Sequence, residues 1–173
     1  WNFHKKFFET LSPEQGKAIS EYTGNGHVYI NNFLRGTPEK SDIPVGEIKR
    51  TIALIDSSFE KGIEIPSGLF LFRGVSSDAS SINIRDGVAV GDNGFFSTSS
   101  NFDMALSHAV KSGTPPTVYV IEISRSGTKG ILGTAHEEEV ILRRNARFQY
   151  KGSKLITAFD GRTVDLIWLS LIK

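Results

Sequence analysis

The spacing of hydrophobic residues predicts helices in the first part of the chain. Ser12 followed by Pro13, with Gln15 at the third helical position, is typical of a helix N-terminus. We expect this helix to end at Gly24. A second, short helix is predicted over residues 27–34. Apolar residues then recur at helical spacing in a third segment, at Val45, Ile48, Ile52, Ile55 and Phe59.

From Pro66 onward, short apolar runs bounded by turn residues predict strands. Ser100 or Asn101 can cap one helix among them. Residues 124–135 are expected to form a loop, and residues 151–153 a turn between two short strands. The predicted strands cover residues 69–75, 88–90, 95–99, 117–123, 147–150, 155–159 and 164–172, the last of them as a central strand.

Helices followed by many short strands joined by tight turns indicate the α+β class, with a mostly antiparallel core of two packed sheets. The chain has 173 residues, of which 39% are hydrophobic and 23% charged, which fits one domain with a sizeable core. We therefore expect a single domain over residues 1–173, mainly helical in residues 1–65 and β-rich in residues 66–173.

Composition narrows the functional classes. The net charge of +1 does not indicate a nucleic-acid or membrane surface. The sequence contains no cysteine, which excludes disulfides, thiolate metal sites and a cysteine nucleophile. No apolar run reaches transmembrane length, and the N-terminus does not have the pattern of a signal peptide. A chain that begins at Trp1 is typical of an excised or processed domain.

An acidic triplet, Glu137-Glu138-Glu139, stands directly before an apolar run of strand type. In a strand, Glu137 and Glu139 would share one face, and each would raise the pKa of the other. The alternative is a solvated charge run at a strand end. His136 precedes the triplet, but no second histidine lies at the spacing of a zinc motif, so no metal site is predicted.

Two more polar features interrupt predicted strands. Arg73 is a charge inside the apolar run 69–75, where the alternative is an edge residue whose head reaches water. Ser97-Thr98-Ser99 ends the next strong strand, where the alternative is an ordinary polar strand end.

Taken together and in this order, Arg73, Ser97-Thr98-Ser99 and Glu137-x-Glu139 resemble the R-S-E class of mono-ADP-ribosyltransferases. The likeness extends to the aromatic-Arg-Gly strand at residues 72–75 and to the apolar run after Glu139. It covers nearly the whole chain. It implies the fold of that family and the transfer of ADP-ribose from NAD to an arginine side chain, with release of nicotinamide. NAD is then the substrate, and no metal is needed.

The resemblance also implies roles for the motif residues. Glu139 would bond the 2′-hydroxyl of the nicotinamide ribose and stabilise the oxocarbenium-like transition state. Ser97 would hold Glu139 in place, and Arg73 would bind the NAD phosphates. Gly74 would let the backbone approach the nicotinamide amide. Glu137 would bind the acceptor, and as the first Glu of Glu-x-Glu it implies an arginine acceptor.

The remaining NAD contacts follow from the same resemblance. Thr98 and Ser99 belong to the NAD-binding strand. Tyr22 and Asn31 match positions that contact NAD in the toxin branch, with helix packing and a surface amide as the alternatives. His108 stands where the family often has a phenylalanine that stacks on nicotinamide, and Phe102 competes for that role.

The resemblance implies that the loop over residues 128–136 recognises the acceptor. The resemblance places Ala135 and His136 beside Glu137 there. The aromatic residue that the family often has in this loop is missing, unless His136 takes its place.

The biological role rests on resemblance alone. Small, cysteine-free Glu-x-Glu transferases look like toxins, secreted effectors or bacteriophage transferases. We therefore expect a monomer that acts in the cytoplasm of a target cell on a protein arginine, with an immunity or inhibitor protein as a further partner. The alternatives are an NAD glycohydrolase toxin that depletes NAD, and a non-catalytic binding module with the same fold.

Overall fold

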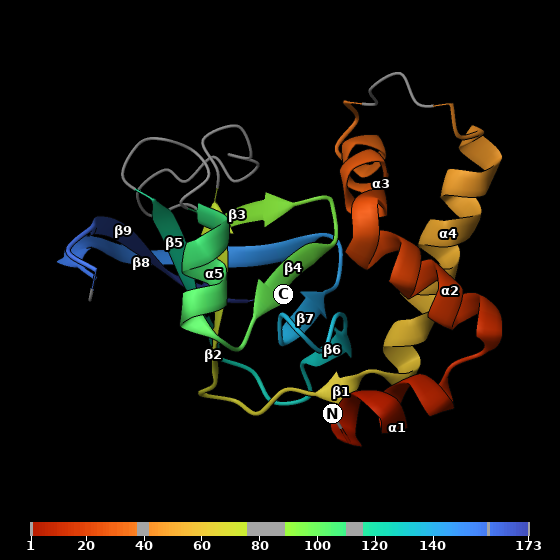
Figure 1. Cartoon of the computed structure of the whole chain (residues 1–173), viewed down its shortest axis with the longest axis horizontal. Coiled ribbons are helices and arrows are strands. Elements are labelled where there is room, and N and C mark those ends of the chain that lie inside the picture. The colour runs from red at the N-terminus through yellow and green to blue at the C-terminus, as the bar shows by residue number, and fades with distance from the viewer. Residues whose placement is uncertain (1, 38–41, 76–88, 110–115, 159, 173) are drawn as a thin grey trace.

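The computed structural model describes residues 2–37, 42–75, 89–109, 116–158 and 160–172. Helices form the first part of the chain and pack on one side of a mixed sheet (Figure 1). They are α1 (Asn2–Thr10), α2 (Pro13–Glu21), the π-helical turn η1 (Tyr22–Gly26), α3 (His27–Leu34), α4 (Val45–Ser58) and the 3-10 turn η2 (Phe59–Lys61).

The predicted start of α2 is confirmed. The Ser12 hydroxyl accepts from the Gln15 amide at 3.2 Å, and the Gln15 side chain accepts from the Ser12 amide at 3.0 Å. The expected end at Gly24 is a kink instead, because Gly24 leaves helical geometry (φ −79°, ψ −122°) and the chain continues into α3. Helix α1 was not predicted as a separate helix from the sequence. On it Phe3 is 78% exposed, while Phe7 is buried.

The strands form one hydrogen-bonded order, β1-β6-β7-β4-β2-β5-β9-β8-β3, in which β5 and β9 are parallel and the other described pairs are antiparallel. The predicted α+β fold with a mostly antiparallel core is confirmed. The two halves that we expected as separate sheets join where Phe72 of β2 pairs with Ser99 of β4. The strands are β1 (Ile63–Glu64), β2 (Phe70–Val75), β3 (Ala89–Asp92), β4 (Phe96–Ser99), β5 (Thr117–Ile123), β6 (Lys129–Leu132), β7 (Glu139–Leu142), β8 (Ala146–Thr157) and β9 (Thr163–Leu171).

Two local predictions were wrong. The expected loop over residues 124–135 contains β6, which pairs with both β1 and β7. The expected turn at residues 151–153 is part of the continuous strand β8, which pairs with β9 across a bulge between Tyr150 and Gly152. Gly152 has φ 148°, so the glycine marks a bulge and not a chain reversal. The predicted central strand is β9, which lies between β5 and β8.

Helix α5 (Phe102–Ala109) lies against β2, on the half of the sheet away from α1–α4 (Figure 1). Asn101 caps it, because its side-chain oxygen accepts from the Asp103 amide at 2.9 Å. Gly74 makes the close approach possible, since a Cβ at this position would lie 1.9 Å from the Ala105 carbonyl oxygen.

The helical segment and the sheet meet at an aromatic contact. The Phe59 ring stacks on Phe95 with 6.2 Å between centroids, and the Tyr22 ring meets Phe95 edge-on at 5.6 Å. An ion pair reinforces this junction, because Arg35, just after α3, donates to both carboxylate oxygens of Asp92 in β3 at 2.9 and 2.7 Å. Among the described residues, no helix has the length and apolar character needed to cross a bilayer.

We predict that Phe59→Ala lowers the free energy of unfolding by about 3–5 kcal/mol, because the Phe59 ring is fully buried at this junction. Urea unfolding measures the change. The matched control is Leu155→Ala, whose side chain is 63% exposed and whose removal should change stability by less than about 0.5 kcal/mol. Equal losses in the two variants would contradict this account of the core.

Candidate active site

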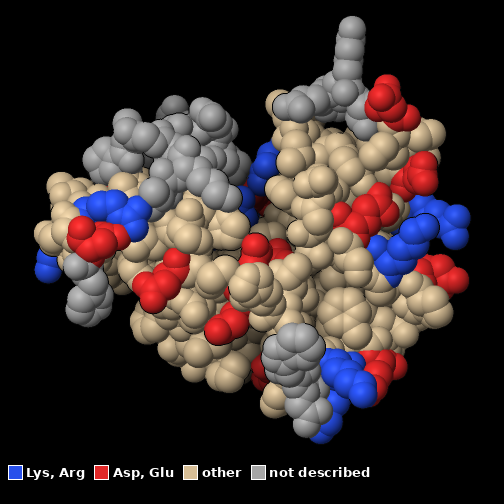
Figure 2. All heavy atoms as spheres, in the orientation of Figure 1, with Lys and Arg blue, Asp and Glu red and all other residues tan. Residues whose placement is uncertain are grey.

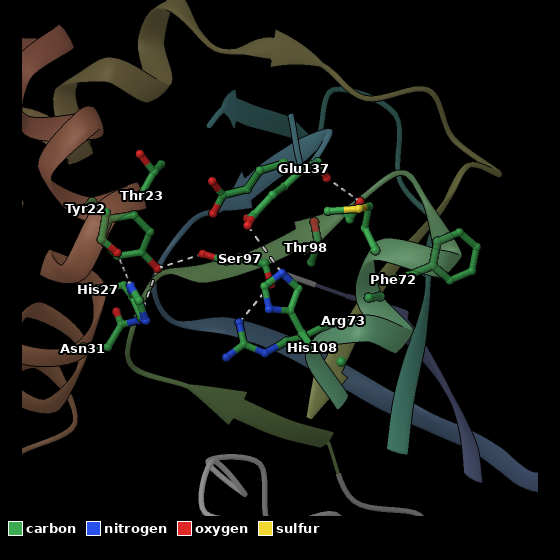
Figure 3. A pocket seen from close by; sticks show the side chains of 16 residues that line it. Tyr22, Thr23, His27, Asn31, Phe72, Arg73, Ser97, Thr98, His108 and Glu137 are labelled. Carbon is green, nitrogen blue, oxygen red and sulfur yellow. Dashed lines mark hydrogen bonds and ion pairs between the residues drawn. The ribbon is translucent and has the colours of Figure 1, made fainter. Parts of the chain in front are cut away.

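A cavity of about 620 Å³ lies between the helical segment and the sheet (Figure 3). Figure 2, in the orientation of Figure 1, shows acidic side chains near the middle of the face that is turned toward the viewer. The structure brings ten of the thirteen predicted site residues into the lining of the cavity. These are Tyr22, Asn31, Arg73, Gly74, Ser97, Thr98, Ser99, His108, Glu137 and Glu139.

The other three predicted residues lie outside this lining. Phe102 packs edge-on against Phe72 with 5.6 Å between centroids. Ala135 is partly buried and His136 is exposed, both in the turn that leads into β7. His108 lines the cavity, with its Nε2 atom 3.5 Å from an oxygen of Glu137.

Glu139 is the first residue of β7, and its carboxylate is buried in the cavity, with the residue 7% exposed. The Thr134 amide donates to Glu139 Oε2 at 3.1 Å. Burial raises the pKa of Glu139, and the nearby charge of Glu137 acts in the same direction. Hydrogen bonds from the Thr134 amide and the Ser97 hydroxyl lower that pKa and partly offset the burial.

We had expected the whole acidic triplet to lie in a strand. Glu137 and Glu138 instead lie in a turn, and β7 begins only at Glu139. Glu138 has φ 47°, in the left-handed region, and its side chain turns outward to accept from the Ser100 hydroxyl at 2.8 Å. Glu137 lies on the rim of the cavity with its side chain 39% exposed, while Glu139 lies inside. The two carboxylates thus face the same cavity with different access to solvent.

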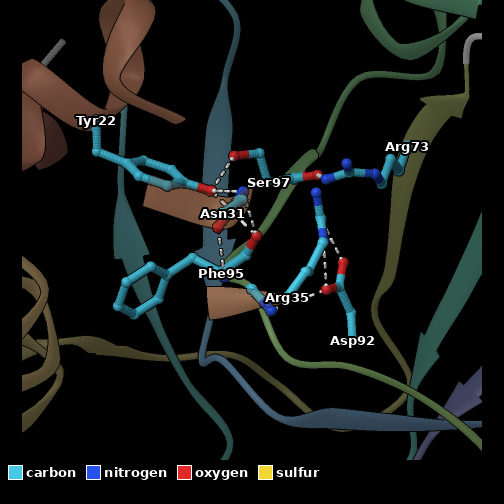
Figure 4. A network of polar contacts seen from close by, with 8 residues as sticks. Tyr22, Asn31, Arg35, Arg73, Asp92, Phe95 and Ser97 are labelled. Carbon is cyan, nitrogen blue, oxygen red and sulfur yellow. Dashed lines mark hydrogen bonds and ion pairs between the residues drawn. The ribbon is translucent and has the colours of Figure 1, made fainter. Parts of the chain in front are cut away.

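Ser97 is held by a network that starts in the helical segment (Figure 4). The Tyr22 hydroxyl lies 3.2 Å from Ser97 Oγ and 3.1 Å from the Phe95 carbonyl oxygen. Asn31 donates to both Tyr22 and the Phe95 carbonyl at 3.1 Å, and its side-chain oxygen accepts from the Phe95 amide at 2.9 Å. Asn31 is therefore buried and not a surface amide, and Tyr22 contributes a hydroxyl to the site as well as packing.

The other two hydroxyls of the Ser-Thr-Ser motif bind the backbone of the acidic segment. Thr98 donates to the Val140 carbonyl at 2.5 Å, and Ser99 donates to the Glu137 carbonyl at 2.7 Å. Ser99 also accepts from the Asn101 amide at 3.0 Å at the start of α5. These contacts fix the acidic turn against β4.

Arg73 is not an edge residue, because β2 lies between β4 and β5. Its guanidinium donates to the Ser97 carbonyl at 2.9 Å and lies over the Phe96 ring, 4.4 Å from the centroid. Burial lowers the pKa of Arg73. Among the described residues, no carboxylate forms an ion pair with Arg73, which lines the cavity.

Two residues beside the carboxylates lie in the loop over residues 128–136 that was predicted to recognise the acceptor, but the sequence analysis assigned no role to either. Thr134 contacts both Glu137 and Glu139, and Gly133 packs against the Glu139 carboxylate. Their place in this loop, with only Ala135 and His136 between Thr134 and the acidic triplet, was the available signal. Within the described part of the chain, no group of three His, Asp or Glu side chains has the arrangement of a metal site.

Comparison with known proteins places the chain in a family. The model of the ADP-ribosyltransferase exoenzyme family matches residues 2–168, and the chain belongs to this family. A stretch of 71 residues, 39% of the chain, is 41% identical to NAD(+)--arginine ADP-ribosyltransferase of Enterobacteria phage T2. That match covers 10% of the phage enzyme, so the chain spans about a tenth of the length of this curated relative.

Solved structures confirm the fold. Plx2a, an ADP-ribosyltransferase toxin from Paenibacillus larvae, matches with a TM-score of 0.73 and 18% identity, over 98% of this chain and 91% of the toxin. The ADP-ribosyltransferase Vis from Vibrio splendidus, in complex with agmatine, matches with a TM-score of 0.69 and 17% identity, over 99% of this chain and 84% of Vis.

We predict that Glu139→Gln stabilises the folded protein at pH 7. Because the pKa of Glu139 is higher in the folded than in the unfolded chain, ionisation above the unfolded value of about 4.3 weakens the folded state. Each kcal/mol gained raises Tm by roughly 2–4 °C in a chain of this size. Thermal unfolding at pH 7 and at pH 4 measures the gain, which should vanish at pH 4, where both states are largely protonated.

Glu9→Gln is the control for this comparison, since the Glu9 side chain is 62% exposed. Its Tm should match the wild type at both pH values. A Glu139→Gln variant that is less stable than the wild type at pH 7 would contradict the description of Glu139 as a desolvated carboxylate.

Proposed function

We propose that the chain is the catalytic domain of an R-S-E class mono-ADP-ribosyltransferase that moves ADP-ribose from NAD to an arginine side chain. The observation that carries this proposal is the meeting of Glu139, Ser97 and Arg73 in one cavity, with Glu137 on its rim. Family membership and the fold support it, as does the partial match to a phage enzyme named for this activity.

The cavity suits NAD in volume and in charge. About 620 Å³ lies within the range of small-molecule sites. Arg73 is a partly buried cation without an ion pair among the described residues, and a pyrophosphate would supply the missing negative charge. The buried carboxylate of Glu139 lines the same cavity, where it would meet the nicotinamide ribose of a bound NAD.

The chemistry then follows from the charges. As the bond between the ribose C1′ and the nicotinamide nitrogen breaks, nicotinamide leaves with the bonding electron pair and positive charge develops on the ribose. Glu139 stabilises this charge from a fixed position, because Ser97 and Thr134 hold its carboxylate before the reaction begins. Tyr22 and Asn31 act through Ser97, since their polar atoms bond to Ser97 and Phe95.

Glu137 is placed to receive the acceptor. A carboxylate on the rim can pair with a guanidinium that enters from solvent. An arginine nitrogen then attacks C1′ and gives a proton to Glu137 as the new bond forms. The structure of Vis with agmatine, a guanidinium compound, is consistent with a guanidinium acceptor for this fold.

The biological role extends the same proposal. As a single domain and a monomer, the chain would act as a toxin or delivered effector in the cytoplasm of a target cell. Its substrate would be NAD, its acceptor a protein arginine and its further partner an immunity or inhibitor protein. Support comes from the fold shared with ADP-ribosylating toxins and from the match to the phage enzyme.

We predict that Glu139→Gln abolishes both NAD hydrolysis and transfer, while Glu137→Gln loses transfer to arginine and keeps hydrolysis. The reason is that the buried carboxylate serves bond cleavage and the rim carboxylate serves the acceptor. Labelled NAD with agmatine or with cell lysate measures both activities in the wild type and the two variants. NAD loss without label transfer in the wild type would indicate a glycohydrolase. Identical losses in both variants would refute the division of roles.

We also predict that Arg73→Lys weakens NAD binding and lowers the rate of NAD cleavage. Lysine keeps the charge but loses the two-pronged contact with phosphate and the planar stack on Phe96. An effect of about 1.5–3 kcal/mol, a loss of roughly 10- to 100-fold, is expected for one charged hydrogen bond. Calorimetry with NAD and steady-state kinetics measure the two effects. Arg162→Lys, an exposed substitution, should leave both unchanged.

A further inference from the structure

Thr134 contacts both carboxylates of the acidic turn. Its hydroxyl oxygen lies 3.4 Å from Glu137 Oε2 and 3.4 Å from Glu139 Oε2. A hydroxyl group has one proton, so it can donate to only one of the two carboxylates at a time. Both distances are long for an O–H···O bond, whose usual length is about 2.7–2.8 Å. The hydroxyl is therefore shared between two equal acceptors.

The backbone around Thr134 fixes this position. The Thr134 amide donates to Glu139 Oε2 at 3.1 Å, the Glu139 amide donates to the Thr134 carbonyl at 3.1 Å, and the Gly133 amide donates to the Glu139 carbonyl at 3.0 Å. A Cβ on Gly133 would lie 2.1 Å from Glu139 Oε2. Only glycine at residue 133 lets the carboxylate and the Thr134 hydroxyl come so close.

We propose that Thr134 is a positioning residue that couples acceptor binding to NAD cleavage, by donating its hydroxyl hydrogen bond to Glu139 when an arginine occupies Glu137. This inference rests on the proposed function. In the free enzyme, Glu137 and Glu139 compete for the hydrogen bond from the Thr134 hydroxyl. An acceptor guanidinium supplies Glu137 with its own donors, so the Thr134 hydroxyl turns fully to Glu139 and supports its ionised form.

Through this coupling, the hydrogen bonding of Glu139 depends on whether an acceptor is bound at Glu137. With water as the acceptor, the Thr134 hydroxyl stays shared between Glu137 and Glu139. Glu139 then receives its hydrogen bond only part of the time. With arginine bound, Glu139 gains a full hydrogen bond in the transition state, where positive charge forms on the ribose. Thr134 thus favours transfer over wasteful hydrolysis of NAD, without touching either substrate.

The test compares Thr134→Val, which removes the hydroxyl and keeps the shape, with Thr134→Ser, which keeps the hydroxyl. We expect Thr134→Val to lower kcat/KM for transfer to agmatine roughly tenfold, the equivalent of one hydrogen bond to a charged group. NAD hydrolysis without acceptor should fall by less than about threefold, since only part of a bond is lost there. Thr134→Ser should restore both rates. Thr163→Val, on the exposed start of β9, is the matched control and should behave as wild type.

A second measurement does not depend on activity. Carboxyl NMR titration should show a higher pKa for Glu139 in Thr134→Val than in the wild type, because a donor to the charged form has been removed. His27, His108, Tyr22, Arg73 and Glu137, the other ionisable groups in the lining, are the same in both proteins.

The outcomes separate the two proposals. An active wild type whose transfer and hydrolysis fall by the same factor in Thr134→Val, or do not fall, would overturn the coupling and leave the transferase assignment standing. An unchanged pKa of Glu139 would overturn it as well. A folded wild type that cleaves no NAD would refute the proposed function itself, and the coupling with it.

Discussion

The arrangement of the active site is organised around one buried carboxylate. Glu139 is desolvated in a cavity, and burial opposes its ionised form. Two hydrogen-bond donors partly offset the cost of burying the charge. They are the Thr134 amide and the Ser97 hydroxyl, which both donate to the Glu139 carboxylate. Glycine at residue 133 is needed for the same reason, because a side chain there would overlap the carboxylate. A carboxylate whose ionised form is met by fixed donors in a partly dry site is suited to stabilise a positive charge on a substrate.

The Ser97 hydroxyl must be held facing Glu139, and this explains how the helical segment and the sheet are joined. Tyr22 lies in the π-helical turn after α2 and Asn31 in α3. Both bond to Phe95, the residue before β4, and Tyr22 also bonds to Ser97 in β4. The Arg35–Asp92 ion pair and the stacked rings of Phe59 and Phe95 hold the same junction a few residues away. The helices therefore do more than cover the core, since they fix the hydroxyl that faces Glu139. Damage to the junction should disturb the site as well as the fold.

Much of this arrangement could be predicted from the sequence, because the signals were local. The capping box at Ser12, the strand over residues 117–123 and the helix over residues 27–34 follow from periodicity and end residues, and the structure confirms all three. The meeting of Arg73, Ser97 and Glu139 followed from their order along the chain. A family resemblance carried that expectation where spacing alone could not.

The features that the sequence did not predict depend on contacts between residues that are distant along the chain. Strand β6 has only Lys129-Gly130-Ile131-Leu132 as its local signal, and it forms because β1 and β7 lie on either side. The acidic triplet has the pattern of a strand start, but Glu138 adopts a left-handed conformation once Ser99 and Ser100 bind the turn. Thr134 belongs to no sequence motif, and only the three-dimensional structure shows that it contacts both Glu137 and Glu139.

A crystal structure of the Glu139→Gln variant with intact NAD would test the central claim most directly, since this substitution should prevent cleavage and leave the cavity in place. We predict that the nicotinamide ribose lies with its 2′-hydroxyl within hydrogen-bonding distance of residue 139, that the phosphates lie against Arg73, and that Glu137 remains open to solvent. NAD bound outside this cavity, or bound inside it with the ribose turned away from residue 139, would contradict the account.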